Sequence, residues 1–100
     1  MNQTANHRTV TEVAEAAALL SLDELCNAAA LSPQWVVERV QSGLLVDLSG
    51  EPAAWRFDSW VLRRACSMAR LEREFDAVPE LAALVADLED EVQRLRQSRR

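Results

Sequence analysis

Glycine and proline are scarce in this sequence, with two glycines and three prolines in 100 residues. So few chain breakers, beside a large content of alanine and leucine, disfavour a β fold with many turns and favour helices. A chain of this length has room for one domain around one hydrophobic core and none for a second, catalytic domain. We therefore expect a small, mainly α-helical protein.

Cysteine and histidine are also rare. Cys26 and Cys66 each lie in an apolar helical stretch with no second cysteine or histidine at metal-ligand spacing, and His7 stands alone in a polar stretch. This predicts two buried, reduced thiols, no metal site and a cytoplasmic location. No apolar run approaches the ~20 residues that a helix needs to cross a bilayer, and the N-terminus lacks a signal-peptide pattern. We expect neither a secreted nor a membrane-bound protein.

Motifs that carry catalysis are missing as well. No nucleophile is placed beside a base, and two glycines cannot form a glycine-rich phosphate loop. Acid pairs such as Glu72/Glu74 and Glu89/Asp90 fall on predicted amphipathic helices, where neighbouring carboxylates usually form a solvated face. The sequence therefore predicts a binding protein with no catalytic residues and no cofactor.

Two capping patterns place a pair of helices next to each other. Ser21 with Glu24 three residues later is a capping box that opens the first helix. Ser32 followed by Pro33 opens the second helix, which should end at Gly43. Because only two residues separate the helices, we expect a tight helix-turn-helix corner.

The segment after the corner favours a small β-hairpin, or wing. Two short apolar runs, residues 44–48 and 55–57, flank the turn-forming sequence Ser-Gly-Glu-Pro. Alternation within the second run should put Trp55 and Phe57 on one face and Arg56 on the other.

Two further helices are predicted in the second half of the chain. Asp58 or Ser59 caps a helix that extends to about Phe75, with apolar residues at helical spacing. A last helix runs from Pro79 to about Gln97 and would be roughly 30 Å long at 1.5 Å per residue. The expected organisation is a leader over residues 1–18, a winged helix-turn-helix core over 19–75 and a long acidic helix over 76–100.

The apolar residues of the last helix follow heptad spacing, at intervals of 4, 3, 4 and 3. They are Leu81, Val85, Leu88, Val92 and Leu95, here called the seam. Such a seam requires a second helix to cover it. We expect a homodimer, and the alternative is an antiparallel hairpin with the preceding helix.

Negative charge is concentrated between residues 72 and 91, which hold eight carboxylates and one arginine, a net charge of −7. Helices usually relieve such repulsion with a basic residue at i+4, and that relief is almost absent here. This pattern favours an acidic docking face for a basic protein surface.

A helix-turn-helix followed by a wing also suggests DNA binding. The second helix, however, carries a single arginine, Arg39, matched by Glu38, and the whole chain has a net charge of −5. Both features oppose binding to phosphates. Arg56, Arg63 and Arg64 are expected to pair with local acids such as Asp58. The alternative function, a DNA-binding transcription regulator, would use Trp35, Arg39, Arg56 and Arg63.

Several stretches together resemble the chaperone-modulator (CbpM-type) family, which has a MerR-like helix-turn-helix fold. They are Leu20–Cys26 (LSLDELC), Leu31–Val37 (LSPQWVV), Gly43–Val46 (GLLV), Trp55–Asp58 (WRFD), Ala69–Leu71 (ARL) and Leu88–Val92 (LEDEV). The most specific is Trp55–Asp58, which leads into an arginine-bearing helix.

The resemblance implies a mainly α-helical, MerR-like winged helix-turn-helix that ends in a helical hairpin. It also implies a non-catalytic inhibitor that binds the J-domain of a DnaJ-like co-chaperone and blocks its interaction with Hsp70. The positions that match the family's acidic pair are Asp90 and Glu91. On physical grounds we add Glu80 and Asp87 to the expected partner-binding site.

Overall fold

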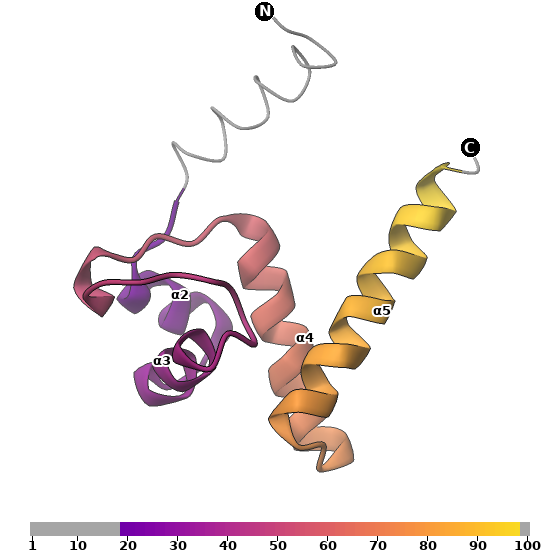
Figure 1. Ribbon diagram of the computed structural model, residues 1–100, viewed down its shortest axis with the longest axis horizontal. Helices are drawn as coiled ribbons and strands as arrows, with labels where there is room; N and C mark the ends of the chain where they lie inside the picture. Colours follow the sequence, from indigo (N-terminus) through magenta and orange to yellow (C-terminus); the bar gives the residue numbers. More distant parts are fainter. Residues whose placement is uncertain (1–18, 99–100) are drawn as a thin grey trace, which may run out of the picture.

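The computed structural model describes residues 19–98, so the predicted leader and His7 lie outside the described residues. Within this range the chain is mainly helical, as predicted, and holds four α-helices and one 3₁₀ turn (Figure 1). These elements are α2 (Leu22–Ala29), α3 (Pro33–Gln41), the 3₁₀ turn η1 (Pro52–Ala54), α4 (Ser59–Phe75) and α5 (Pro79–Ser98).

The corner between α2 and α3 forms as the caps predict. The Ser21 hydroxyl accepts a hydrogen bond from the Glu24 backbone N–H, and the Glu24 carboxylate accepts one from the Ser21 N–H at 2.8 Å. Ala30 ends α2 in the left-handed region with a φ of 57°. The Ser32 hydroxyl then accepts the Trp35 N–H at 3.1 Å and opens α3. Together these bonds satisfy backbone groups that helix ends leave unpaired.

The predicted β-hairpin is wrong: between residues 19 and 98 the only strand-like pairing is an isolated antiparallel bridge between Leu20 and Phe57. The two residues exchange backbone hydrogen bonds of 2.8 Å. The intervening sequence does not form a hairpin turn, because Pro52 starts the 3₁₀ turn η1 instead. Residues 55–57 thus pair with the segment before α2, and residues 44–48 form no strand.

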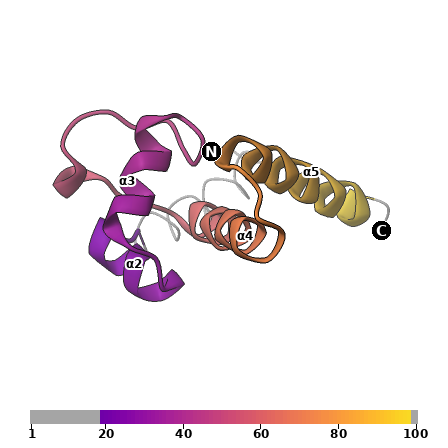
Figure 2. The same cartoon turned by 90° about the horizontal axis from the view of Figure 1, so that it is seen from below.

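Helix α4 lies between the α2–α3 corner and α5 in both views of the molecule (Figures 1 and 2). The largest fully buried side chains of the core are Phe57, Leu25, Leu45, Met68 and Val36. Each such side chain stabilises the fold by about 1.5–3 kcal/mol relative to leaving it exposed.

The aromatic residues before α4 behave as their alternation predicts. Trp55 and Phe57 are buried and their rings meet edge to face at 6.3 Å, whereas Arg56 is exposed. The Trp55 indole N–H donates to the Ser49 carbonyl at 3.2 Å. These contacts hold the long loop after α3 against the core without a β-sheet.

Helices α4 and α5 form a hairpin. The Asp58 carboxylate caps α4 by accepting the Val61 N–H at 2.9 Å, and α4 ends at Asp76, which is left-handed with a φ of 53°. The residues of α5 that are buried are Ala82, Ala83 and Ala86. From residue 87 to residue 98 every residue of α5 is exposed, and the helix diverges from α4 toward its C-terminal end (Figure 1).

The two cysteines differ in a way that the sequence did not indicate. Cys26 is buried on α2, where burial and, to a smaller extent, the Asp23 carboxylate raise the pKa of its thiol. The expectation of a buried thiol is wrong for Cys66, which is exposed on α4. Cys66 directly follows the buried Ala65, and successive residues of a helix point about 100° apart, so its side chain is turned away from the core.

No helix between residues 19 and 98 combines the length and the apolar character that crossing a membrane requires.

Because the α4–α5 contact is made by alanines, we expect it to reject a larger side chain. Ala82→Leu should lower the free energy of unfolding by about 1–3 kcal/mol, since Ala82 is fully buried and the added atoms force the helices apart. Denaturant unfolding followed by circular dichroism measures this. The matched control is Ala28→Leu on the exposed face of α2, which should change stability by less than about 0.5 kcal/mol. Equal stability of the two variants would contradict close packing at this interface.

Candidate partner-binding surface

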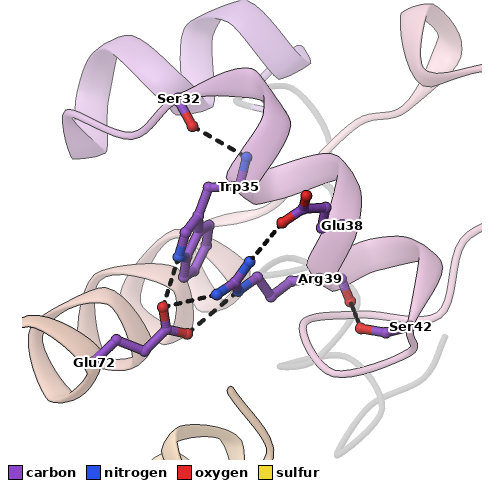
Figure 3. A network of polar contacts seen from close by, with 6 residues as sticks. All are labelled: Ser32, Trp35, Glu38, Arg39, Ser42 and Glu72. Carbon is purple, nitrogen blue, oxygen red and sulfur yellow. Dashed lines mark hydrogen bonds and ion pairs between the residues drawn. The ribbon is translucent and has the colours of Figure 1, made fainter. Parts of the chain in front are cut away.

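The one arginine of α3 is held by a carboxylate of α4. Arg39 donates to Glu72 through Nη2 at 2.8 Å and Nε at 3.2 Å, and the Trp35 indole N–H donates to the same carboxylate at 2.9 Å (Figure 3). The guanidinium carbon also lies 4.6 Å from the centre of the Trp35 ring. The side chains of Arg39 and Glu72 are only 12% and 16% exposed. Arg39 is therefore part of the joint between α3 and α4.

This joint engages Arg39, the one cation that α3 could direct at DNA phosphates. With Arg39 and Trp35 engaged, the exposed side chains of α3 include Gln34, Gln41 and the carboxylate of Glu38, which is 71% exposed. A groove-entering helix needs cations or amides directed at phosphates and bases, and a carboxylate there is repelled. The structure thus strengthens the argument from charge against DNA binding by α3.

The arginines near α4 do not pair with Asp58, as the sequence suggested, because Asp58 caps α4. Arg56 donates to the carbonyls of Ala53 and Trp55. Arg64 donates to the carbonyls of Leu44 and Leu45 and forms an ion pair with Asp87. Arg64 therefore ties the loop after α3 to both helices of the hairpin.

All four predicted partner-binding acids, Glu80, Asp87, Asp90 and Glu91, are exposed on α5. With 3.6 residues per turn, Glu80, Asp87 and Glu91 share one flank of the helix, whereas Asp90 points in the direction of the buried alanines, toward α4. The bond from Arg64 to Asp87 shows that this flank faces the loop after α3. We call these four residues the acidic flank.

The acids of α4 and α5 are less isolated than the sequence indicated. Five of the eight carboxylates between residues 72 and 91 have an arginine partner: Glu72 with Arg39, Glu74 and Glu89 with Arg70, Asp87 with Arg64, and Glu91 with Arg94. Most of these arginines come from other elements, so an i+4 search along α5 cannot find them. Within residues 19–98, Asp76, Glu80 and Asp90 have no ion-pair partner.

A shallow pocket of about 210 Å³ extends the acidic flank toward α3. Its lining includes Glu38 of α3, Ser42 just after α3, Leu44 of the loop, and Glu80 at the start of α5. Sequence reasoning considered Glu38 only as a residue that repels DNA and missed it as a member of this surface. The signal was available, since an exposed acid in the second helix of a helix-turn-helix favours a basic partner over a nucleic acid.

The seam is not covered by α4. Leu81, Leu88, Val92 and Leu95 are between 46% and 55% exposed, and Val85 is only partly buried. The apolar surface continues through Leu84, Val78 and Phe75, all more than half exposed. Helix α4 packs instead on the alanine face of α5. The predicted helical hairpin therefore exists, but it leaves the seam open to solvent.

Histidine, cysteine, aspartate and glutamate do not gather in groups of three that could hold a metal ion anywhere in the part of the chain that the structure describes.

We expect the Glu72 joint to stabilise the fold. Glu72→Ala should lower the free energy of unfolding by about 1–3 kcal/mol, because the Trp35 indole N–H and the Nε–H and Nη2–H groups of Arg39 lose their acceptor. Arg39 then keeps only its bond to the exposed Glu38 carboxylate. A double-mutant cycle with Arg39→Ala should give a coupling energy of about 1 kcal/mol or more. Glu38→Ala is the control: it removes only the solvent-exposed ion pair of Glu38 with Arg39 and should change stability by less than about 0.5 kcal/mol. Additive effects of the two substitutions would show that the joint contributes nothing as a pair.

Comparison with known proteins identifies relatives over most of the chain. A chaperone modulatory protein CbpM from Coxiella burnetii is 30% identical over 85 residues, which cover 85% of this chain and 80% of the relative. Proteins of the same name from Pseudomonas entomophila and Pseudomonas putida are 35% and 34% identical over 80 and 77 residues, with 77% of this chain and 76% of each relative covered.

No family model matches the sequence, and no solved structure matches the fold. The relatives alone decide the family, through identities of 30–35% over about four fifths of the chain. The chain therefore belongs to the family of chaperone modulatory proteins named CbpM.

Proposed function

We propose that this protein is a cytoplasmic, non-catalytic modulator of a chaperone system. It binds the J-domain of a DnaJ-like co-chaperone and blocks the productive interaction of that J-domain with Hsp70. The family supports the chaperone-modulating role. The observation that carries the binding mode is the exposed acidic flank of α5, with Glu38 of α3 beside it.

Charge complementarity explains how such a surface inhibits. A J-domain presents a basic helix to its Hsp70, so an acidic competitor can occupy the same surface. Opposite charges raise the rate of encounter and select the partner, while like charges exclude acidic proteins. Glu80 and Asp90 are the most available members of the flank, because neither is engaged in an ion pair within residues 19–98.

The MerR-like helix-turn-helix interpretation remains part of the proposal for the α2–α3 corner. In this view the corner serves as a scaffold. Its second helix is fixed to α4 by Glu72, and the exposed residues of that helix add an acid to the partner-binding surface. The rival function, a transcription regulator, would use Arg39, the one cation of α3, and Arg39 is engaged in the joint with Glu72.

The J-domain proposal is tested by titration calorimetry of the purified protein against a J-domain from the same source, at low and at moderate salt. Mixed-sequence duplex DNA serves as the parallel ligand. We expect saturable J-domain binding that weakens with salt and no DNA binding. Asp90→Lys/Glu91→Lys should weaken J-domain binding by about two orders of magnitude, because attraction becomes repulsion at two of the four members of the acidic flank.

The matched control is Asp47→Lys/Glu51→Lys, which changes the net charge by the same amount at exposed positions between Leu45 and η1 that line none of the pockets described beside α5. It should retain affinity within about threefold, since only long-range attraction is lost. Unchanged affinity of the α5 variant would contradict the site. DNA binding without J-domain binding would contradict the function.

We also propose that the seam joins two copies of the chain. Its heptad spacing matches the geometry of a two-helix coiled coil, and each leucine stabilises such an interface by about 1.5–3 kcal/mol when buried. Contiguous apolar surface of this kind on a small protein usually marks an interface.

Sedimentation equilibrium tests the dimer. The wild-type protein should have twice the monomer mass at micromolar concentration, and Leu88→Asp should have the monomer mass with an unchanged helical circular dichroism spectrum. Asn27→Asp on the exposed face of α2 introduces the same charge and should remain dimeric. A monomeric wild type would refute the seam as a dimer interface.

A further inference from the structure

A groove lies between α4 and α5, two helices that diverge toward the C-terminal end of α5 (Figure 1). Its volume is about 160 Å³, and residues of both helices line it: Trp60, Arg63, Arg64 and Ser67 of α4, and Glu89 and Asp90 of α5. Asp90 belongs to the acidic flank, so the groove adjoins the proposed partner-binding surface. None of its α4 residues belongs to that surface.

Two of the four charges in the groove are already neutralised. Arg64 is paired with Asp87 and donates to the carbonyls of Leu44 and Leu45. Glu89 is paired with Arg70 at 3.0 Å. Arg63 and Asp90 have neither an ion pair nor a side-chain hydrogen bond within residues 19–98, and both are exposed. The groove therefore presents one available cation on α4 and one available carboxylate on α5.

Trp60 adds an aromatic surface to this pair of charges. Its side chain is 37% exposed, and the Arg64 guanidinium lies 5.5 Å from the ring centre, which holds the ring in place. The indole N–H groups of Trp35 and Trp55 are used inside the fold, by Glu72 and Ser49. The indole N–H of Trp60, by contrast, donates no hydrogen bond to another residue within the described range.

An ordered, part-exposed tryptophan beside unpaired charges has the composition of a binding hot spot. A purely basic ligand fits this groove poorly, since Arg63 would repel it. A purely acidic ligand is repelled by Asp90. The complementary ligand carries both signs.

We infer that this groove receives a segment of the bound partner protein in which one acidic and one basic side chain lie close together. The acidic side chain contacts Arg63, the basic side chain contacts Asp90, and the apolar part of the segment packs on Trp60. This inference rests on the proposed function and adds that the partner's contact surface is bipolar at this point, next to its basic helix.

Arg63→Glu gives the sharpest test, because a purely acidic surface and a bipolar groove predict opposite changes in J-domain affinity. If the partner met only an acidic surface, the added carboxylate would tighten J-domain binding. If the groove receives a bipolar segment, Arg63→Glu should weaken binding about tenfold, since attraction becomes repulsion at that contact. Arg73→Glu is the matched control: it makes the same charge change on the exposed last turn of α4, outside the groove, and should not weaken binding.

A second measurement reports whether the partner contacts Trp60 in the groove. Labelling with 5-fluorotryptophan gives three ¹⁹F resonances, which substitution of each tryptophan by phenylalanine assigns. Addition of the J-domain should shift the Trp60 resonance and leave those of Trp35 and Trp55 nearly unchanged. Trp60→Ala should weaken binding about tenfold or more, as loss of a hot-spot tryptophan does.

The outcomes separate this inference from the proposal on which it rests. Normal J-domain binding by the wild type, together with tighter binding of Arg63→Glu or an unshifted Trp60 resonance, would overturn the groove and leave the proposed function standing. No J-domain binding by the wild type would overturn both. Weaker binding of Arg63→Glu, with Arg73→Glu at least as tight as wild type, would support the groove.

Discussion

The position of α5 depends on its contact with α4 through three alanines. Because Ala82, Ala83 and Ala86 are the residues buried against the hairpin partner, the rotation of α5 about its own axis is fixed. That rotation leaves the leucines of the seam in solvent and places the acidic flank beside the loop after α3. The alanine contact ends at residue 86, and the helices diverge beyond it. The groove lined by Trp60, Arg63 and Asp90 lies in this region. One small-residue interface thus sets the direction of three separate surfaces.

The arginines serve the fold in a similar way. Arg39 joins α3 to α4 through Glu72, and Arg64 joins α4 to α5 and to the carbonyls of Leu44 and Leu45. Cations that a helix-turn-helix protein would direct at phosphates are here used between helices. Of the acids of α5 that have no ion pair within residues 19–98, Glu80 lies beside α3 and Asp90 lies beside α4. Repulsion of nucleic acid and attraction of a basic protein follow from the same distribution.

Much of the fold was predictable from local chemistry, because caps act within three or four residues. Ser21, Ser32 and Asp58 start their helices where the sequence indicated, and Pro79 begins α5. The β-hairpin failed because the partner of Phe57 is Leu20, 37 positions earlier, and no local pattern identifies it. The ion pairs of Glu72 and Asp87 join residues 33 and 23 positions apart. For the same reason, local sequence patterns could not predict that arginines neutralise these acids. The groove was missed for the same reason, since Trp60 and Asp90 meet only when α4 and α5 fold together.

An acidic flank alone is a weak basis for choosing a partner, because exposed carboxylates attract any basic surface and salt screens the attraction. Specificity is a difference between affinities, and it increases when wrong partners meet repulsion. Arg63 supplies that repulsion beside the flank: a uniformly basic protein gains from Asp87, Asp90 and Glu91 and loses at Arg63. Only a partner with a carboxylate at the matching position avoids the loss. The available arginine at the edge of the acidic flank therefore acts as the element that discriminates among basic proteins.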